Sequence, residues 1–323
     1  RQRKRLKNQY QTEYCGNSYY PLPITPTPLQ LISASRRTDI PAWYARWFMN
    51  RVRAGFCDVP NPFNPKQVSR VSLLPEDVAA VVFWTRDPGP IIEHLAELDR
   101  RGLPSMFLLT LLDYPRALDP GTAPLEKRIN RFRRLSDAIG PDRVVWRYDP
   151  IYLSPTTNLD FHRHTFARLA ESLRGRTRRC VISFVDVYRK MEKRLAALES
   201  QGLQPVEPGP ETIAHLMGDM VAEAEKNGME LTSCAETRNL EHLGVRLGRC
   251  IDADYVSRIF DRHLPHRKDP SQRKTCRCSV SKDIGMYDTC PAGCVYCYAT
   301  GNPETARRRH RAHDPESLSL YSP

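Results

Sequence analysis

From residue 31 onward the chain alternates short apolar runs, rich in β-branched residues, with polar stretches and amphipathic segments. Short apolar runs are typical of buried strands, whereas apolar positions that recur every three or four residues indicate helices. The predicted strands are Leu31–Ser35, Cys57–Val59, Val78–Thr85, Ser105–Leu112, Arg143–Tyr148, Cys180–Val185, Glu230–Cys234 and Asp283–Tyr287. The helices predicted between them are Pro41–Ala54, Ile91–Arg101, Pro124–Ala138, Phe161–Leu173, Met191–Gln201 and Glu211–Asn227.

Strands that alternate with helices form parallel sheets, and eight such strands suit a closed barrel. The sequence therefore predicts an α/β fold of the (β/α) TIM-barrel type. We expect a basic N-terminal extension over residues 1–30, the main barrel over 31–260, and a cysteine-rich segment over 261–323 that completes the barrel. Three prolines predict a rigid loop at Asn61–Lys66.

Five predicted strands end in polar or charged residues, at positions 35–39, 84–87, 147–149, 186 and 234–236. The carboxyl ends of parallel strands share one mouth of a barrel, where active sites lie, so these positions supply candidates for catalysis. The candidate catalytic residues are Arg36, Arg37, Asp39, Arg147, Asp149 and Glu236. The alternative is structural, with the first three as loop charges and Asp149 as the start of a turn.

The net charge of +12 comes mainly from the two ends of the chain. Residues 1–7 contribute five basic side chains and residues 307–311 contribute four, which leaves about +3 for the remainder. Basic runs are usually solvated, but they also bind phosphate backbones, so nucleic acid is an alternative partner. No apolar run approaches the roughly 18–20 residues of a membrane-spanning helix, and we expect a cytoplasmic protein with no membrane partner.

Ten cysteines are too few for a disulfide-rich secreted scaffold of this length. Six of them lie between Cys234 and Cys294, with Cys297 just beyond, and such clustering indicates metal. Cys15, Cys57 and Cys180 lie outside the cluster and are expected to be ordinary thiols.

The spacing C-x3-C-x2-C at Cys290, Cys294 and Cys297 is the most specific signal in the chain. Three thiolates on one short loop can hold three irons of a four-iron cluster and leave the fourth iron open to a ligand. Pro291 and Gly293 disfavour a helix and predict a loop around the metal. We therefore expect these cysteines to bind an iron–sulfur cluster.

The same motif, with Tyr296 directly before its third cysteine, resembles the defining motif of the radical S-adenosylmethionine (radical-SAM) superfamily. The resemblance implies that S-adenosylmethionine binds the open iron of a 4Fe-4S cluster and is cleaved to a 5′-deoxyadenosyl radical, which abstracts hydrogen from a substrate. It implies that Tyr296 and Tyr298 flank the adenine. No Gly-Gly-Glu motif follows Leu31–Ser35, so Ser33, Ser35 or a main-chain carbonyl is expected to bind the amino end of the cofactor.

In the superfamily the motif follows the first strand, whereas here it follows the last predicted strand. A circular permutation accounts for this position, because a closed barrel tolerates new chain ends when the old ones are close together. Asp283–Tyr287 would then be the first superfamily strand, Glu304–His313 its helix and Leu31–Ser35 its neighbour.

Over most of its length the chain also resembles the bacterial domain-of-unknown-function family 1848, whose name implies no reaction. The resemblance runs from Ile32 to Tyr298. It is carried by the segments Ser-Ala-Ser-Arg-Arg-Thr-Asp-Ile-Pro, Asn-Pro-Phe-Asn-Pro, Phe-Trp-Thr, Trp-Arg-Tyr-Asp-Pro and Cys-Ala-Glu, together with the cysteine motif.

Four further cysteines precede the motif, at Cys234, Cys250, Cys276 and Cys278. Four thiolates suit a closed cluster, and we expect a second, auxiliary 4Fe-4S cluster beside the same mouth. A structural zinc site and unliganded thiols are the alternatives.

Three functions follow from these observations. The first is a radical-SAM enzyme acting on a small molecule or peptide, with an external electron donor such as flavodoxin or ferredoxin. The second is a radical-SAM enzyme acting on nucleic acid, because Cys-Pro-Ala-Gly-Cys-Val-Tyr-Cys-Tyr is similar to the cysteine loop of spore photoproduct lyase. The third is a non-catalytic metal-binding or electron-transfer protein. Pure electron carriers normally have a protein ligand on every iron, so three cysteines with an open site argue against this function.

Overall fold

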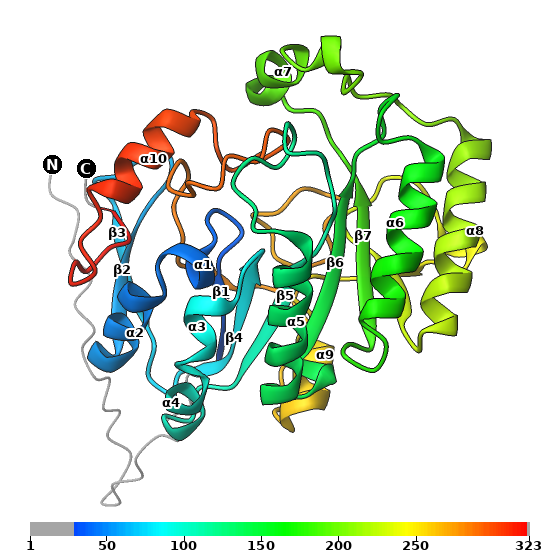
Figure 1. Cartoon of the computed structure of the whole chain (residues 1–323). Coiled ribbons are helices and arrows are strands. Elements are labelled where there is room, and N and C mark those ends of the chain that lie inside the picture. The colour runs from blue at the N-terminus through cyan, green and yellow to red at the C-terminus, as the bar shows by residue number, and fades with distance from the viewer. Residues whose placement is uncertain (1–28, 322–323) are drawn as a thin grey trace, which may run out of the picture.

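The computed structural model describes residues 29–321 as a mixed α/β fold built on one large parallel sheet (Figure 1). Its strands lie in the order β10-β1-β4-β5-β6-β7-β8-β9, and each neighbouring pair is parallel. They are β1 (Gln30–Ala34), β4 (Val78–Thr85), β5 (Ser105–Thr110), β6 (Val144–Ile151), β7 (Arg179–Phe184), β8 (Glu230–Ser233), β9 (Arg246–Leu247) and β10 (Lys282–Asp283).

The helices between the strands confirm the predicted alternation. Two of the predicted helices are split, so that α1 (Ile40–Trp43) precedes α2 (Ala45–Ala54) and α3 (Gly89–Ile92) precedes α4 (Leu95–Arg100). The others are α5 (Leu125–Ile139), α6 (Leu159–Ser172), α7 (Arg189–Ala196), α8 (Pro210–Lys226), α9 (Ala253–Phe260) and α10 (Pro303–Arg311), with short 3-10 turns at Pro141–Arg143, Glu199–Gln201 and Glu241–Leu243. Figure 1 shows α5 in front of the strands, with α6 at the side of β7 and α8 beside α6.

Both faces of the sheet are buried, and successive residues of a strand point to opposite faces. On β4, Val81 and Phe83 pack in the core beneath helices α1 to α8. Val82 and Trp84 pack in a second core that contains residues of α9 and of the segment that leads to β10. Because α9 and this segment cover the second face, both faces of the central strands are buried. The strands are almost continuously apolar, as expected for such a parallel sheet.

The C-terminal strand β10 lies next to the first strand β1, as the sequence predicted. Ile32 pairs with Lys282 and Ser33 with Asp283 in parallel register. The strand is shorter than the predicted Asp283–Tyr287. After it, the backbone at Gly285 runs directly against Ser35. A Cβ atom on Gly285 would lie within 2.5 Å of the Ser35 Cβ.

The prediction for Cys57–Val59 was wrong about its sheet. It forms β2 (Phe56–Pro60), which pairs in antiparallel register with β3 (Val68–Ser72) outside the parallel sheet. A loop of seven residues can join antiparallel strands, whereas a parallel pair needs a long crossover. The remaining place in the large sheet is taken by β9, which is exposed, spans two residues and carries no apolar run.

No helix in the described part of the chain is long and apolar enough to cross a membrane.

Replacing Gly285 with Ala tests the close contact between β1 and the segment after β10. The added methyl group has no space beside Ser35, so we expect a loss of about 1–3 kcal/mol and a melting temperature lower by several degrees. Gly218→Ala is the control, because its Cβ would meet no atom within 4 Å and Ala gains about 1 kcal/mol over Gly inside a helix. Equal melting temperatures for the two variants would contradict this packing.

Candidate functional site

The cysteine motif lies on an irregular loop directly after β10, as Pro291 and Gly293 predicted. Gly293 adopts a left-handed backbone conformation with φ of 75°. The Val295 N–H donates to the carbonyl oxygen of Leu118 at 2.9 Å. A Cβ on Gly121 would lie 2.9 Å from the carbonyl carbon of Ala292, so only glycine allows this approach. The connection between β5 and α5 therefore supports the loop.

The three motif thiols are free and lie in largely apolar surroundings. Burial, followed by the charges of Asp39 and Cys297, raises the pKa of Cys290 to about 12. Burial also raises the pKa of Cys294, although the Arg86 guanidinium opposes the rise. Cys290 and Cys294 are therefore neutral at pH 7 unless a cation binds, and metal binding would release protons from them.

A buried polar network supports the loop from below. The side chain of Tyr296 is only 6% exposed, and its hydroxyl donates to Asp119 Oδ1 at 2.7 Å. The same hydroxyl accepts from Arg86 Nη1 at 2.8 Å, and Arg86 forms an ion pair with Asp119. Arg86 belongs to a predicted polar strand end, but Asp119 was missed, because it lies in a loop with no spacing that links it to Tyr296.

Asp283 connects β10 to the end of β1. Its carboxylate accepts from the hydroxyls of Ser33 and Ser35, each at 2.8 Å, and from the N–H groups of Arg36 at 2.9 Å and Gly285 at 3.0 Å. The Ser33 hydroxyl also accepts from Trp84 Nε1 at 3.1 Å. Both candidate cofactor-binding serines are thus hydrogen-bonded to Asp283, which sequence reasoning had treated only as a strand residue.

Two of the predicted catalytic arginines lie near the same aromatic ring. The Arg147 guanidinium lies 4.6 Å from the centre of the Trp84 ring, and the Arg36 guanidinium lies 5.5 Å from it. Arg147 also pairs with Asp149, which accepts from Ser183. Arg36 Nη2 and Arg147 Nε are buried without a hydrogen-bond partner among the described residues. This part of the predicted polar mouth therefore holds two guanidiniums, one of them paired with Asp149.

The other predicted catalytic residues have structural partners. Arg37 lies over the Tyr287 ring and donates to the carbonyl oxygen of Gly285. Asp39 accepts from the N–H groups of Ala42 at 3.0 Å and Arg86 at 2.8 Å, and burial raises its pKa to about 6.

Glu236 lies farther along the sheet edge, after β8. Its carboxylate accepts from the N–H groups of Phe184, Thr237 and Arg238, and it pairs with the Arg238 guanidinium. Glu236 therefore holds its own loop against β7. The polar strand end at Asp186 likewise pairs with Arg273.

The two candidate adenine-flanking tyrosines differ in exposure. Tyr296 is buried in the network with Arg86, whereas Tyr298 is 43% exposed and its ring centre lies 6.2 Å from that of Tyr188. The Tyr298 hydroxyl donates to the carbonyl oxygen of Arg36 at 2.8 Å.

The second cysteine set converges, although its members come from distant parts of the sequence. The sulfurs of Cys234 and Cys250 are 2.9 Å apart. The neighbouring thiols of Cys234, Cys250 and Cys276 lower the pKa of Cys278. The remaining cysteines, Cys57 and Cys180, are buried free thiols, as expected, and Cys15 lies outside the described residues.

No three His, Cys, Asp or Glu side chains within residues 29–321 form a group that could hold a single metal ion. In a four-iron cluster each thiolate binds a different iron, so the ligands of a cluster need not converge on one point as those of a single ion do.

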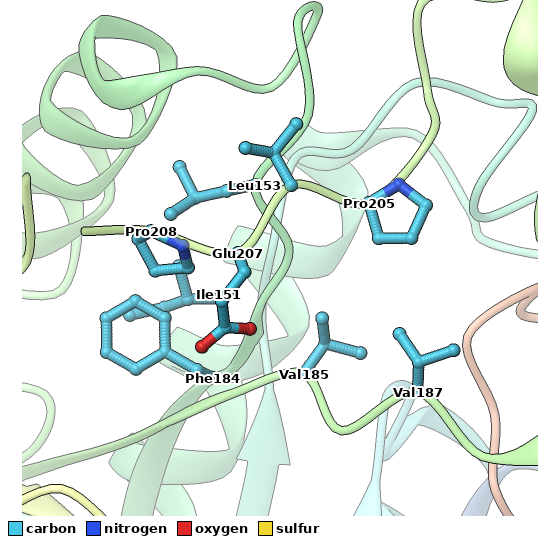
Figure 2. A pocket seen from close by; sticks show the side chains of 9 residues that line it. Ile151, Leu153, Phe184, Val185, Val187, Pro205, Glu207 and Pro208 are labelled. Atoms are coloured by element: carbon cyan, nitrogen blue, oxygen red, sulfur yellow. The ribbon is translucent and has the colours of Figure 1, made fainter.

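A separate pocket of about 170 Å³ lies at the carboxyl ends of β6 and β7 (Figure 2). Its lining is apolar except for Glu207, which pairs with Arg238. Neither a cysteine nor a predicted catalytic residue lines this pocket. It is also smaller than the roughly 300–1,000 Å³ of typical ligand sites.

Replacing Tyr296 with Phe tests the network beneath the cysteine loop. The change leaves Arg86 Nη1 and one Asp119 oxygen buried and without their shared partner, which should cost about 1–3 kcal/mol. Tyr298→Phe is the matched control, because the Tyr298 side chain is more exposed and its hydroxyl donates to a single carbonyl oxygen, that of Arg36. Thermal unfolding should show a clear drop for Tyr296→Phe alone, and a larger drop for Tyr298→Phe would contradict the arrangement.

Comparison with known proteins shows the family of the chain. No curated protein matches it. One solved structure that it resembles is described as a "putative alpha-L-fucosidase from Bacteroides thetaiotaomicron VPI-5482", with 9% identity, 93% of this chain and 98% of that chain covered, and a TM-score of 0.28. A likeness this weak does not define the fold. The family model described as "Domain of unknown function (DUF1848)" matches residues 31–299, so the chain belongs to this family.

Proposed function

We propose that the protein is a radical-SAM enzyme that acts on a polar small molecule or peptide. The observation that carries this proposal is the loop with Cys290, Cys294 and Cys297, which follows a strand at the edge of the parallel sheet. All three cysteines lie in or against the same core. When bound, a four-iron cluster with S-adenosylmethionine supplies a radical that abstracts hydrogen from a substrate.

The surroundings of the loop fit such a cofactor. Arg86 lies close enough to Cys294 to offset negative charge there. Arg194 Nη2 donates to the carbonyl oxygen of Cys297 at 3.0 Å, while its Nε and Nη1 are buried and find no partner among the described residues. Two unpaired guanidinium donors beside the loop suit a carboxylate such as that of S-adenosylmethionine.

The proposal gives the other side chains definite tasks. Arg194 would bind the carboxylate, and Tyr298 would lie beside the adenine with Tyr188. Arg36 and Arg147 would orient a polar or anionic part of the substrate, because each has an unpaired donor near Trp84. Tyr296 would hold the loop in place and would not contact the adenine.

The strand order supports the permuted form of the superfamily barrel. Read from β10, the sheet continues through β1 and β4 to β9 in chain order. The helix α10 follows the cysteine loop, where the helix of the first superfamily strand is expected. The closure of the sheet into a barrel is part of this proposal.

Cofactor cleavage after anaerobic reconstitution tests the activity. With iron and sulfide restored, and dithionite in place of flavodoxin or ferredoxin, we expect formation of 5′-deoxyadenosine, measured by mass spectrometry. Cys294→Ala should lose this product and the brown colour of its cluster. Cys57→Ala is the control, because Cys57 is also buried but lies on the β2–β3 hairpin.

Two outcomes would contradict the proposal. Cleavage by Cys294→Ala would exclude the motif as the site of reaction. A cluster bound by the three cysteines without any cleavage would favour the non-catalytic electron-transfer function.

The exposed arginines of α10 favour nucleic acid as the alternative substrate class. Arg307, Arg308 and Arg311 are exposed on the helix that directly follows the cysteine loop. If they bind phosphates, replacing all three with Gln should weaken DNA or RNA binding. The slope of log binding constant against log salt concentration should become less steep by up to about three. Replacing the exposed Arg100, Arg134 and Arg178 is the control for net charge. Equal binding by both triple variants would exclude α10 as a phosphate-binding surface.

A further inference from the structure

The second cysteine set is assembled by three separate parts of the chain. Cys234 directly follows β8, Cys250 follows β9, and Cys276 and Cys278 lie between α9 and β10. Cys250, Cys276 and Cys278 are buried, and Cys234 is partly buried. All four cysteines lie in or against the same core, where the β8–β9 edge of the sheet meets the segment that leads to β10.

Main-chain hydrogen bonds hold these segments together independently of the thiols. The Gly248 N–H donates to Ser233 O at 2.9 Å and joins the first two segments, and the Ser279 N–H donates to Ile251 O at 2.9 Å and joins the last two. In addition, the Ile251 N–H donates to the Cys278 sulfur at 3.4 Å. An N–H donor to sulfur is typical of a metal-bound thiolate.

Two guanidiniums lie near the four sulfurs. Arg36 acts electrostatically on Cys278, and Arg147 acts on Cys234 and Cys250. Each arginine also has a neighbouring carboxylate, since Asp149 pairs with Arg147 and Asp283 lies near Arg36. Four thiolates around a divalent ion carry a net charge of −2, which these arginines offset in part.

We propose that Cys234, Cys250, Cys276 and Cys278 form a tetrathiolate site for one thiophilic metal ion, either zinc or iron. This assignment replaces the auxiliary four-iron cluster expected from the sequence and is independent of the proposed radical-SAM activity. The distance of 2.9 Å between the sulfurs of Cys234 and Cys250 carries the choice. In a cubane each thiolate binds its own iron, so the sulfurs stand wider apart than the ligands of a single ion.

Metal entry requires a small rearrangement. Around a tetrahedral zinc with bonds of about 2.3 Å, sulfurs lie about 3.8 Å apart. Cys234 and Cys250, at 2.9 Å, must therefore separate by about 1 Å, and this is why the described thiols do not form a ready site for an ion. The thiols lose their protons to solvent as the four metal–sulfur bonds form.

The experiment uses the full chain with Cys290, Cys294 and Cys297 replaced by Ala, so that only the second set remains. Purified and freed of metal under reducing conditions, this protein should bind one Co²⁺ and show the intense visible absorption of tetrahedral thiolate cobalt. Adding Cys278→Ala should abolish these bands, whereas adding Cys180→Ala, a buried thiol on β7, should leave them unchanged.

Metal analysis of the same protein as purified distinguishes the ions and the cluster. One zinc, or one iron without sulfide, agrees with the proposal. About four irons with equal sulfide would overturn it in favour of a cubane, and failure of the folded protein to bind Co²⁺ would overturn it altogether. If the Cys278→Ala variant does not fold, the melting temperature of the protein that retains Cys278 is measured with and without one equivalent of Zn²⁺. A rise on adding Zn²⁺ supports the site, and no rise would contradict it.

Discussion

The Asp283 carboxylate accepts hydrogen bonds from two serine hydroxyls and two backbone N–H groups, and the position of the cysteine loop depends on this arrangement. The strand that contains Asp283 spans only two residues, so its backbone pairing with β1 is limited. The side-chain bonds to Ser33 and Ser35 extend that connection beyond the strand. Because the motif begins a few residues later, any shift of Asp283 would move all three thiols relative to the carboxyl ends of the sheet.

Arg36 connects the two cysteine sets. Its N–H donates to Asp283, its carbonyl oxygen accepts from Tyr298 beside the motif, and its side chain contacts Cys278 of the second set. The motif cysteine Cys294 packs in the core beneath the helices, whereas Cys278 packs in the core on the other face of the sheet. A change of charge at the second cysteine set therefore acts on Arg36, and the backbone of Arg36 helps to position the cysteine motif.

Much of the fold followed from the sequence, because buried parallel strands give continuous apolar runs that need no knowledge of their partners. The apolar pattern failed to predict the structure where the neighbouring strand determines how a segment pairs. Cys57–Val59 is apolar enough for a strand, but the short loop to Val68–Ser72 makes it half of an antiparallel hairpin. Arg246–Leu247 is a strand only because β8 lies beside it.

The same limit applies to the site. The cysteine spacing and the loop after β10 were predicted, since both are local. Asp119 and Arg194 were missed, because their roles arise from contacts with residues that lie more than a hundred positions away. The convergence of the second cysteine set was expected from residue type, but the close approach of Cys234 and Cys250, on which the proposal of a single ion rests, has no sequence signal.

Electron paramagnetic resonance of the reconstituted, dithionite-reduced protein tests the central claim most directly. A cluster held by three cysteines has an open iron, so S-adenosylmethionine should bind it and change the g values of the reduced cluster, with no change in the Cys294→Ala variant. A reduced cluster whose spectrum is identical with and without S-adenosylmethionine would contradict the account.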